Sequence, residues 1–299
     1  MSAAHARKKP FLRLATAAVA MVAALGMAAC SGGAGSASSS SGAQVGDRTP
    51  EQIQEAGEIV IGIFSDKAPF GYIDADGKPA GYDVVYGDRI AADLGVTAKY
   101  VPVDAAARTE VLASNKVDIT LANFTVTPER AEKVDFANPY FKVSLGVVSP
   151  TSAEITDVSQ LAGKTLIVTK GTTAEAYFEA NHPEIKLLKF DQYSDAYQAL
   201  EDGRGDAFST DNTEVIAWAI AHPGFSVGIK SLGDTSYIAA AVKKGNTALL
   251  DWLNNQLVEL GEEDFFHKDY EQTLAPVYGD AATPDDLVVE GGVDTTSTN

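Results

Sequence analysis

Residues 118–140 constrain the fold more than any other stretch of the sequence. They begin with an apolar run that predicts a buried strand, which ends in the polar side chains of Asn123 and Thr125. Pro128 follows at a first helical position and starts a short helix that carries Arg130. In open α/β sheets, ligands bind outside the carboxyl ends of the strands, and an arginine there offers paired donors to a carboxylate. The stretch therefore predicts an α/β fold with an anion site at this corner.

Strand and helix patterns alternate along the chain from about residue 51 to residue 279. Short β-branched runs are each followed by a segment in which apolar residues keep helical spacing. Later in the chain, two separate strands are expected at 225–230 and 237–242, and one helix is expected over 247–266. Alternation of this kind predicts an α/β protein.

Two segments of the sequence resemble each other, at 116–125 and 204–213. In each, a basic residue ends a helix, an aspartate opens a strand, and a polar side chain follows five positions later. These polar side chains are Asn123 and Asp211, at the carboxyl ends of two different strands. The echo predicts two similar α/β lobes that face each other over a cleft. Chance similarity between helix-to-strand joints is the alternative.

The N-terminus has the pattern of an export signal. Basic residues without an acidic one precede an apolar run over 14–29, and small residues lead into Cys30. The run is shorter than the roughly 20 residues of a spanning helix, so residues 1–29 resemble a lipoprotein signal peptide, with Cys30 as the lipid-modified residue. An ordinary secretory signal with an incidental cysteine is the alternative. Residues 30–50 are expected to form a flexible, Ser/Gly-rich tether.

The acidic balance of the chain limits its partners. The formal net charge is -18 over 299 residues, which disfavours nucleic acid as a partner. The segment Gly224-Phe-Ser-Val-Gly228 has the spacing of a hydrolase nucleophile elbow, but it lies between a predicted helix and a following strand, not on a strand-to-helix turn. The few histidines lack metal-ligand spacing. Neither a metal nor a cofactor is therefore expected.

The longest motif resembles that of a known family. Residues 122–140 look like the signature of the polar amino-acid-binding lipoproteins of bacterial ABC importers, extracellular solute-binding protein family 3. Similar segments occur in the family's order at 81–84, 170–177, 206–212 and 242–246. The resemblance covers about residues 58–279. It implies a type II periplasmic-binding-protein fold, in which two α/β lobes are joined by two hinge strands and hold the ligand in the cleft.

The repeated segments, the long strands expected near Leu145 and Ala240, and the local composition divide the chain into regions. Lobe 1 is expected over 51–145 and 241–279, and lobe 2 over 146–240. Residues 280–299 are expected to form a loose, acidic C-terminal tail.

The resemblance also implies roles for individual side chains. It assigns the α-carboxylate of an amino acid to Arg130 and the α-ammonium to Asp211. A zwitterion needs such a cation and anion at a fixed separation. The polar residues expected to complete this clamp are Asn123, Thr125, Thr172 and Thr173.

The side-chain pocket departs from the commonest family pattern, which has aromatic rings near positions 67 and 105. This chain has Lys67 and Ala105 instead. Arg108 resembles an arginine of the branch that binds acidic amino acids and cysteine. A small polar or acidic ligand side chain is therefore expected, as in cysteine, glutamate or aspartate, with Phe70 as a further candidate contact.

Purely structural interpretations of these residues remain open. Arg130 could pair with a neighbouring carboxylate on the surface, and Asp211 could be the N-cap of the helix that follows it. Residues 171–173 could simply start a capped helix, and Phe70 could be a core aromatic.

The resemblance implies an extracytoplasmic receptor, held to the outer face of the cell membrane through a lipid at Cys30. It would bind one free amino acid as a monomer and deliver it to ABC permease subunits. One alternative is a dehydratase-like enzyme on the same scaffold that acts on a small carboxylate, although no spare general acid or base is evident. Another is a sensor domain without a transport role.

Overall fold

The structure is a computed structural model that describes residues 43–293. Its strands are β1 (Glu58–Ile63), β2 (Asp66–Lys67), β3 (Gly71–Ile73), β4 (Pro79–Ala80), β5 (Thr97–Pro102), β6 (Ile119–Thr120), β7 (Val134–Pro150), β8 (Thr165–Thr169), β9 (Lys186–Phe190), β10 (Ala207–Asp211) and β11 (Phe225–Lys243). Its α-helices are α1 (Pro50–Ala56), α2 (Tyr82–Leu94), α3 (Arg108–Ala113), α4 (Pro128–Ala131), α5 (Thr173–Asn181), α6 (Tyr193–Glu201), α7 (Asn212–Ala221), α8 (Thr247–Glu262), α9 (Phe265–Thr273), α10 (Ala275–Tyr278) and α11 (Pro284–Leu287). Short 3₁₀ helices are η1 (Ala105–Ala107), η2 (Thr151–Ala153), η3 (Val158–Leu161), η4 (Gly279–Ala281) and η5 (Glu290–Gly292). Cys30 and the predicted signal peptide lie outside the described residues.

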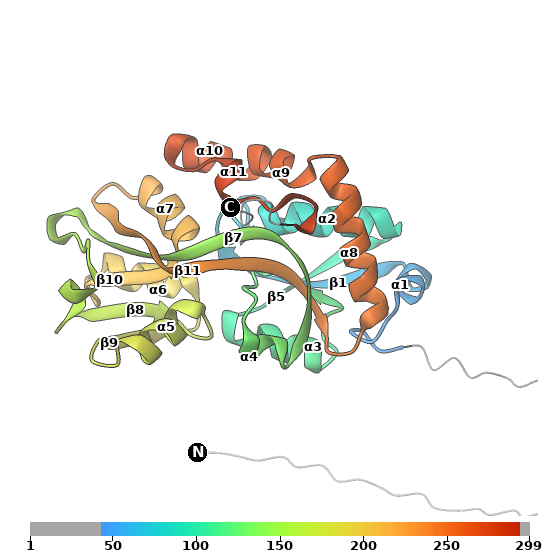
Figure 1. The fold of residues 1–299 in the computed structure, drawn as a ribbon, viewed down its shortest axis with the longest axis horizontal. Coiled ribbons are helices and arrows are strands. Elements are labelled where there is room, and N and C mark those ends of the chain that lie inside the picture. The colour runs from blue at the N-terminus through green and yellow to red at the C-terminus, as the bar shows by residue number, and fades with distance from the viewer. Residues whose placement is uncertain (1–42, 294–299) are drawn as a thin grey trace, which may run out of the picture. The chain divides into compact units, whose positions relative to one another are not determined.

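An eight-stranded sheet runs through the described part of the chain (Figure 1). Its strand order is β5-β1-β6-β11-β7-β10-β8-β9, so the long strands β11 and β7 lie at its centre. β6 pairs in parallel with β1 and antiparallel with β11. β10 pairs in the same way with β8 and β7. This sheet confirms the predicted α/β fold, and it gives β6 and β10 the equivalent positions that the repeated segments suggest.

The sheet has two halves, which share its central strands. We call β5, β1 and β6 with the surrounding helices α1, α2, α3, α4, α8 and α9 the first half. β10, β8 and β9 with α5, α6 and α7 form the second half. Figure 1 shows the first half at the right and the second at the left, with β7 and β11 running from one to the other. A small sheet of β2, β3 and β4 packs on α2 in the first half, and its strand β2 reaches α6 of the second.

Strand β11 differs from the sequence-based expectation. Two strands are predicted at 225–230 and 237–242, but the structure has one strand across both. Register shifts against β7 between Val227 and Ala241 absorb the turn-forming residues that lie between the predicted strands. Because of these bulges, one strand serves both halves of the sheet.

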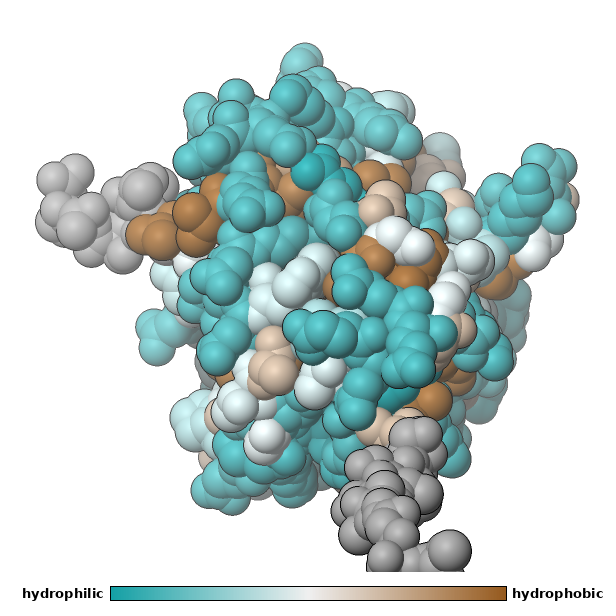
Figure 2. Space-filling model, turned by 90° about the vertical axis from the view of Figure 1, so that its right-hand side faces the viewer, coloured by the Kyte–Doolittle hydropathy of each residue, from teal (hydrophilic) through white to brown (hydrophobic). Residues whose placement is uncertain are grey.

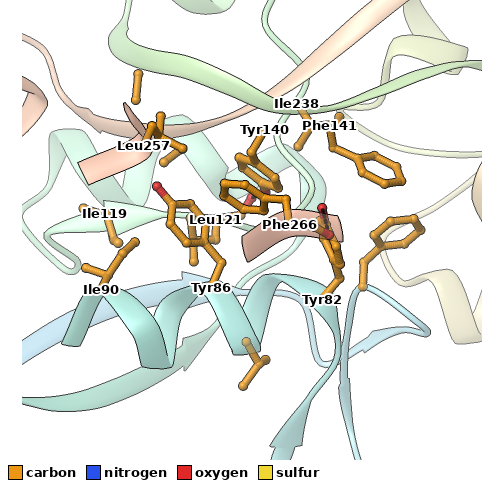
Figure 3. Packing of buried hydrophobic residues seen from close by; sticks show 14 of the residues in the cluster. Tyr82, Tyr86, Ile90, Ile119, Leu121, Tyr140, Phe141, Ile238, Leu257 and Phe266 are labelled. Carbon is orange, nitrogen blue, oxygen red and sulfur yellow. Dashed lines mark hydrogen bonds between the residues drawn. The ribbon is translucent and has the colours of Figure 1, made fainter. Parts of the chain in front are cut away.

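The single helix predicted over 247–266 is also divided in the structure. α8 and α9 are separated at Asp264, whose backbone is left-handed with φ 51°. The break turns the chain so that Phe266 enters the core, where its ring stacks on Tyr140 with centroids 5.4 Å apart. Figure 3 shows both rings beside Tyr86 of α2. The helical spacing of apolar residues ends at Leu260, and the polar run that separates it from Phe265 is the sequence signal of this break.

The expectation of a loose C-terminal tail is wrong for the part of it that the structure describes. Leu287, Val288 and Val289 are buried, and the Val289 N–H donates to the Tyr140 carbonyl over 3.1 Å. The Glu290 carboxylate accepts backbone N–H groups from the first turn of α9. Three apolar side chains therefore fix the segment to the first half despite its acidic composition.

The surface is polar on the side that Figure 2 shows. Hydrophobic residues occupy small, separated areas there, whereas the large buried side chains gather in clusters on the sheet. Among residues 43–293, no helix is both long and apolar enough to cross a membrane.

Candidate functional site

The chain after β6 forms a corner built around Asn123. Its backbone is left-handed with φ 42°, its N–H donates to Asp83 Oδ2 over 2.6 Å, and its carbonyl accepts Arg108 Nη1 over 3.1 Å. The side chain is 1% exposed, and neither its oxygen nor its nitrogen has a hydrogen-bond partner among the described residues. Because a buried amide without partners is costly, this group is a strong candidate for contact with a ligand.

β10 ends at Asp211, on the opposite side of the cleft. Its Oδ2 lies 3.0 Å from Lys67 Nζ of β2, and its side chain makes no capping hydrogen bond to α7. Asp211 therefore occupies the N-cap position of α7 but does not cap the helix with its side chain. Glu214 of α7 also forms an ion pair with the Lys67 ammonium, with its Oε2 3.2 Å from Lys67 Nζ. Lys67 also donates to the Tyr193 hydroxyl over 3.2 Å.

Burial and the mutual attraction of opposite charges together set the protonation of this ionic cluster. It opposes the charge on Lys67, but the carboxylates of Asp211 and Glu214 outweigh it and raise the pKa of Lys67 well above its usual value. Burial is also the main cause that raises the pKa of Glu214 to about 7. Lys67 is therefore protonated at neutral pH, whereas Glu214 titrates near neutrality. Across residues 43–293, no group of His, Cys, Asp and Glu side chains is placed to hold a metal ion.

The corner and the ionic cluster enclose a narrow cavity between the two halves. About 180 Å³ is free of protein atoms, and no water-sized sphere fits inside. The walls of the cavity must therefore move to admit any ligand. Its lining residues are Lys67, Arg108, Asn123, Thr125, Thr172, Thr173, Tyr193 and Asp211.

Arg108 is buried in the wall of this cavity, where its guanidinium is committed to backbone carbonyls. Nε donates to Ala105 over 3.0 Å, and Nη1 donates to Ala122 and Asn123, each over 3.1 Å. Nη2 donates to Gly171 in the second half over 3.2 Å. These bonds leave little donor capacity for a ligand. Arg108 acts chiefly as a brace that links the two halves.

Gly171 of the second half lies close against the first half. Its carbonyl accepts Nη2 of Arg130 over 2.8 Å and Nη2 of Arg108 over 3.2 Å, both from the first half. Its φ is 73°, and a Cβ at this position would lie 2.4 Å from Ala106 Cα. Only glycine permits this approach without displacement of the backbone.

Seven of the nine predicted ligand residues line the cavity, and Arg130 and Phe70 do not. Arg130 borders a wider groove beside it and donates to the Thr125 carbonyl over 2.7 Å, instead of joining a surface ion pair. Burial, and then the charge of Arg108, lowers the pKa of Arg130 to about 9, so it remains a cation at neutral pH. Phe70 packs in the core against Phe141, with ring centroids 5.5 Å apart.

Thr172 has a structural role as well as a place in the cavity lining. Its hydroxyl accepts the Glu175 N–H over 3.2 Å as the N-cap of α5 and donates to the Thr169 carbonyl over 2.6 Å. The capped-helix interpretation therefore holds for Thr172.

This architecture matches a known group of proteins. A family model for bacterial extracellular solute-binding proteins, family 3, matches residues 59–274. The chain belongs to this family. Its members are extracellular proteins by that description, and the type II periplasmic-binding-protein fold expected from the sequence is confirmed.

Several relatives of this family-3 protein have known structures or curated functions. The solute receptor for L-cysteine of Neisseria gonorrhoeae shares 50% sequence identity, with a TM-score of 0.80 over 81% of this chain and 100% of that chain. The cysteine-binding protein of Campylobacter jejuni also shares 50% identity, with a TM-score of 0.79 over 81% of this chain and 98% of that chain. The ABC transporter glutamine-binding protein of Bacillus subtilis (strain 168) is 29% identical over 227 residues, 74% of this chain and 83% of that protein.

Two residues of the site were not predicted from the sequence. They are Tyr193, which lines the cavity, and Glu214, which belongs to the ionic cluster. Tyr193 starts α6 shortly after β9, so the rule that sites form beyond the carboxyl ends of strands could have identified it. Glu214 lies in the first turn of α7, beside the buried residues Val215 and Ala217. A lone carboxylate on such an apolar face signals a buried partner.

Proposed function

We propose that this chain is the substrate-binding component of a bacterial ABC importer and that its ligand is the free amino acid L-cysteine. The observation that carries the proposal is that the Asp211 carboxylate and the unpartnered amide of Asn123 line the same cavity. A small zwitterion supplies a partner to each. Further support comes from two relatives at 50% identity, one described as a solute receptor for L-cysteine and the other as a cysteine-binding protein.

In this proposal the α-carboxylate of the ligand binds at the corner after β6. Arg130 donates two hydrogen bonds to the carbonyls of Thr125 and Gly171, and its remaining N–H groups are available to a carboxylate that enters between the halves. Asp211 receives the α-ammonium. The hydroxyl-bearing residues that complete the site are Thr125, Thr172 and Thr173.

The contacts that the buried cations already make within the protein favour cysteine over glutamate or aspartate as the ligand. An acidic ligand brings a second carboxylate, which needs a cation of its own. Lys67 is engaged by Asp211 and Glu214, and Arg108 is engaged by backbone carbonyls. Because neither cation is spare, a neutral side chain such as a thiol fits the site better.

Binding is proposed to act through closure of two lobes, 51–145 with 241–279 as lobe 1 and 146–240 as lobe 2. A ligand that bridges the corner after β6 and the end of β10 gains contacts only when the halves meet, so it shifts the population toward the closed state. The closed monomer then delivers the ligand to ABC permease subunits.

The proposed location is the outer face of the cell membrane, with a lipid on Cys30. The support is the signal-like sequence that precedes this cysteine. Cys30→Ser should release the protein from membranes into the medium, as measured by fractionation and immunoblotting. Continued membrane association of the variant would count against the anchor.

No chemical reaction is proposed for the site. Glu214 has a pKa suited to proton transfer, but it does not line the cavity, and Asp211 is paired with Lys67. Recovery of L-cysteine unchanged after long incubation with the protein is the expected result. A new product that depends on the protein would favour the dehydratase-like alternative.

The role of Arg130 tests the proposed function. Calorimetry with L-cysteine, kept reduced, should show saturable binding by the wild type and none by Arg130→Ala, while the unfolding temperature of the ligand-free variant stays close to wild type. Unchanged affinity would remove Arg130 from the site. Parallel titrations with L-glutamate, L-glutamine and L-cystine define the preference.

A further inference from the structure

The buried carboxylate of Asp83 binds the backbone of Asn123, which lines the cavity. We propose that Asp83 is a positioning residue, which holds the Asn123 backbone so that the Asn123 side chain points into the ligand cavity. Asp83 itself does not line the cavity. The inference rests on the proposed function, because that function gives the Asn123 side chain its ligand.

One carboxylate oxygen of Asp83 binds a residue of the site, and the other binds a residue of the core. Asp83 lies in the first turn of α2 and is 0% exposed. Its Oδ2 accepts the Asn123 N–H over 2.6 Å, and its Oδ1 accepts the Tyr140 hydroxyl over 2.6 Å. Burial raises the pKa of Asp83 to about 6, so at pH 7.5 the carboxylate is ionised. Both bonds are then charge-assisted and stronger than neutral ones.

Tyr140 gives this carboxylate a rigid support. Its ring stacks on Phe266 with centroids 5.4 Å apart and lies 5.2 Å from the ring of Tyr86. Figure 3 shows these rings packed together between β7 and α2. Because the core fixes the Tyr140 hydroxyl, it also fixes the carboxylate oxygen that binds it. The position of Asp83 is thus set by the hydrophobic core.

Asn123 depends on this support because its backbone lies in the left-handed region, with φ 42°. Residues other than glycine visit this region only occasionally, asparagine among them, and local hydrogen bonds favour it there. Asp83 holds its N–H and Arg108 holds its carbonyl, so the peptide groups on both sides are fixed. Loss of the Asp83 bond permits the backbone to relax into an ordinary region, which turns the side chain away from the cavity.

A double-mutant cycle tests this coupling. In the otherwise native chain, Asp83→Ala should weaken L-cysteine binding by roughly tenfold or more, because a hydrogen bond to a charged group is lost. Asp83→Asn should weaken it less, because the amide oxygen still accepts the Asn123 N–H. In the Asn123→Ala background, Asp83→Ala should change the affinity less than about twofold, because the side chain through which it acts is gone. An equal loss in both backgrounds would overturn the proposal.

Asp118 offers a matched control. It is also 0% exposed, lies at the other end of β6, and accepts the N–H groups of Gly46 over 3.0 Å and Val60 over 2.8 Å. It also pairs with Arg48. Asp118→Ala should lower the unfolding temperature without changing the affinity. If it weakens binding as much as Asp83→Ala does, the effect is general destabilisation and the positioning role is rejected.

A readout without ligand separates this inference from the proposed function. Amide exchange of the ligand-free protein, followed by NMR, should show that Asp83→Ala removes the protection of the Asn123 N–H and that Asp118→Ala leaves it. Unchanged protection in Asp83→Ala would contradict the positioning role. If the wild type fails to bind L-cysteine, the proposed function fails, and the exchange measurement still decides whether Asp83 positions Asn123.

Discussion

Lys67 lies on the small sheet that packs on the first half, Asp211 ends β10 in the second half, and the two form a buried ion pair across the cavity, with Lys67 Nζ 3.0 Å from Asp211 Oδ2. Lys67 thus takes one oxygen of the carboxylate that is proposed to receive the ligand ammonium. An internal cation of this kind holds the halves together. It also means that the ligand shares Asp211 with the protein or displaces Lys67 from it.

The first prediction concerns removal of this cation. Lys67→Met leaves the carboxylates of Asp211 and Glu214 buried without their counter-ion, which costs several kcal/mol if the halves stay closed. Opening of the cleft hydrates both groups, so the ligand-free variant should have a larger radius of gyration in small-angle X-ray scattering. Lys99→Met removes an exposed lysine 3.9 Å from Glu58 and should leave the scattering unchanged. Identical scattering curves for all three proteins would contradict this role of Lys67.

A second prediction concerns the close approach of the halves. Gly171→Ala places a Cβ 2.4 Å from Ala106 Cα, which blocks closure and should lower the affinity for L-cysteine by tenfold or more, on the order of 1.4 kcal/mol. Gly163→Ala is the matched control, because Gly163 also has a positive φ, 75°, but no atom lies within 4 Å of its added Cβ. Gly163→Ala should introduce the same backbone strain as Gly171→Ala but leave the affinity for L-cysteine unchanged. Equal affinities for both variants would show that closure does not need the contact at Gly171.

A third prediction concerns pH. The pKa of Glu214 is raised from 4.5 to about 7, mainly by burial. A carboxyl group with a raised folded pKa contributes stability that is complete below its unfolded pKa and is lost as the pH rises through the folded value. Between about pH 4.5 and pH 7, the unfolding free energy of the wild type should therefore fall relative to that of Glu214→Gln. Urea titrations of both proteins across this range measure the difference, and a difference independent of pH would contradict the raised pKa.

A fourth prediction concerns the C-terminal segment. The Glu290 carboxylate accepts the N–H groups of Phe266 and His267 over 3.2 and 3.0 Å and lies 2.7 Å from His267 Nδ1. Glu290→Ala should destabilise the protein by about 1–2 kcal/mol, because the first turn of α9 loses its cap. Asp285→Ala removes an exposed carboxylate 3.3 Å from His267 Nε2 and should cost much less. Chemical denaturation compares the two, and equal effects would exclude the capping role.

Local patterns in the sequence were sufficient for the fold class and for the corners at Asn123 and Asp211, whereas the other cavity residues were expected from the family resemblance. Strand-to-loop corners are visible as an apolar run followed by polar residues, and this pattern locates Asn123 and Asp211 at the ends of β6 and β10. The repeated segments around them correspond to the symmetry of the strand order about β11 and β7.

Features that depend on contacts between distant residues could not be derived in this way. The side chains of Lys67 and Arg108 are committed to partners from other elements, so their charge did not show whether a ligand could use them. An aromatic side chain such as Phe70 can contact a ligand, but in the structure Phe70 packs against Phe141 in the core. The burial of Val289 depends on β7, and no local pattern in the acidic tail indicates that partner.

Titration calorimetry of the purified protein with reduced L-cysteine tests the central claim most directly. Saturable binding with one site per chain, which is lost in Arg130→Ala and stronger than binding of L-glutamate, is the predicted result. The absence of binding heat up to millimolar L-cysteine, together with an unchanged unfolding temperature, would contradict it.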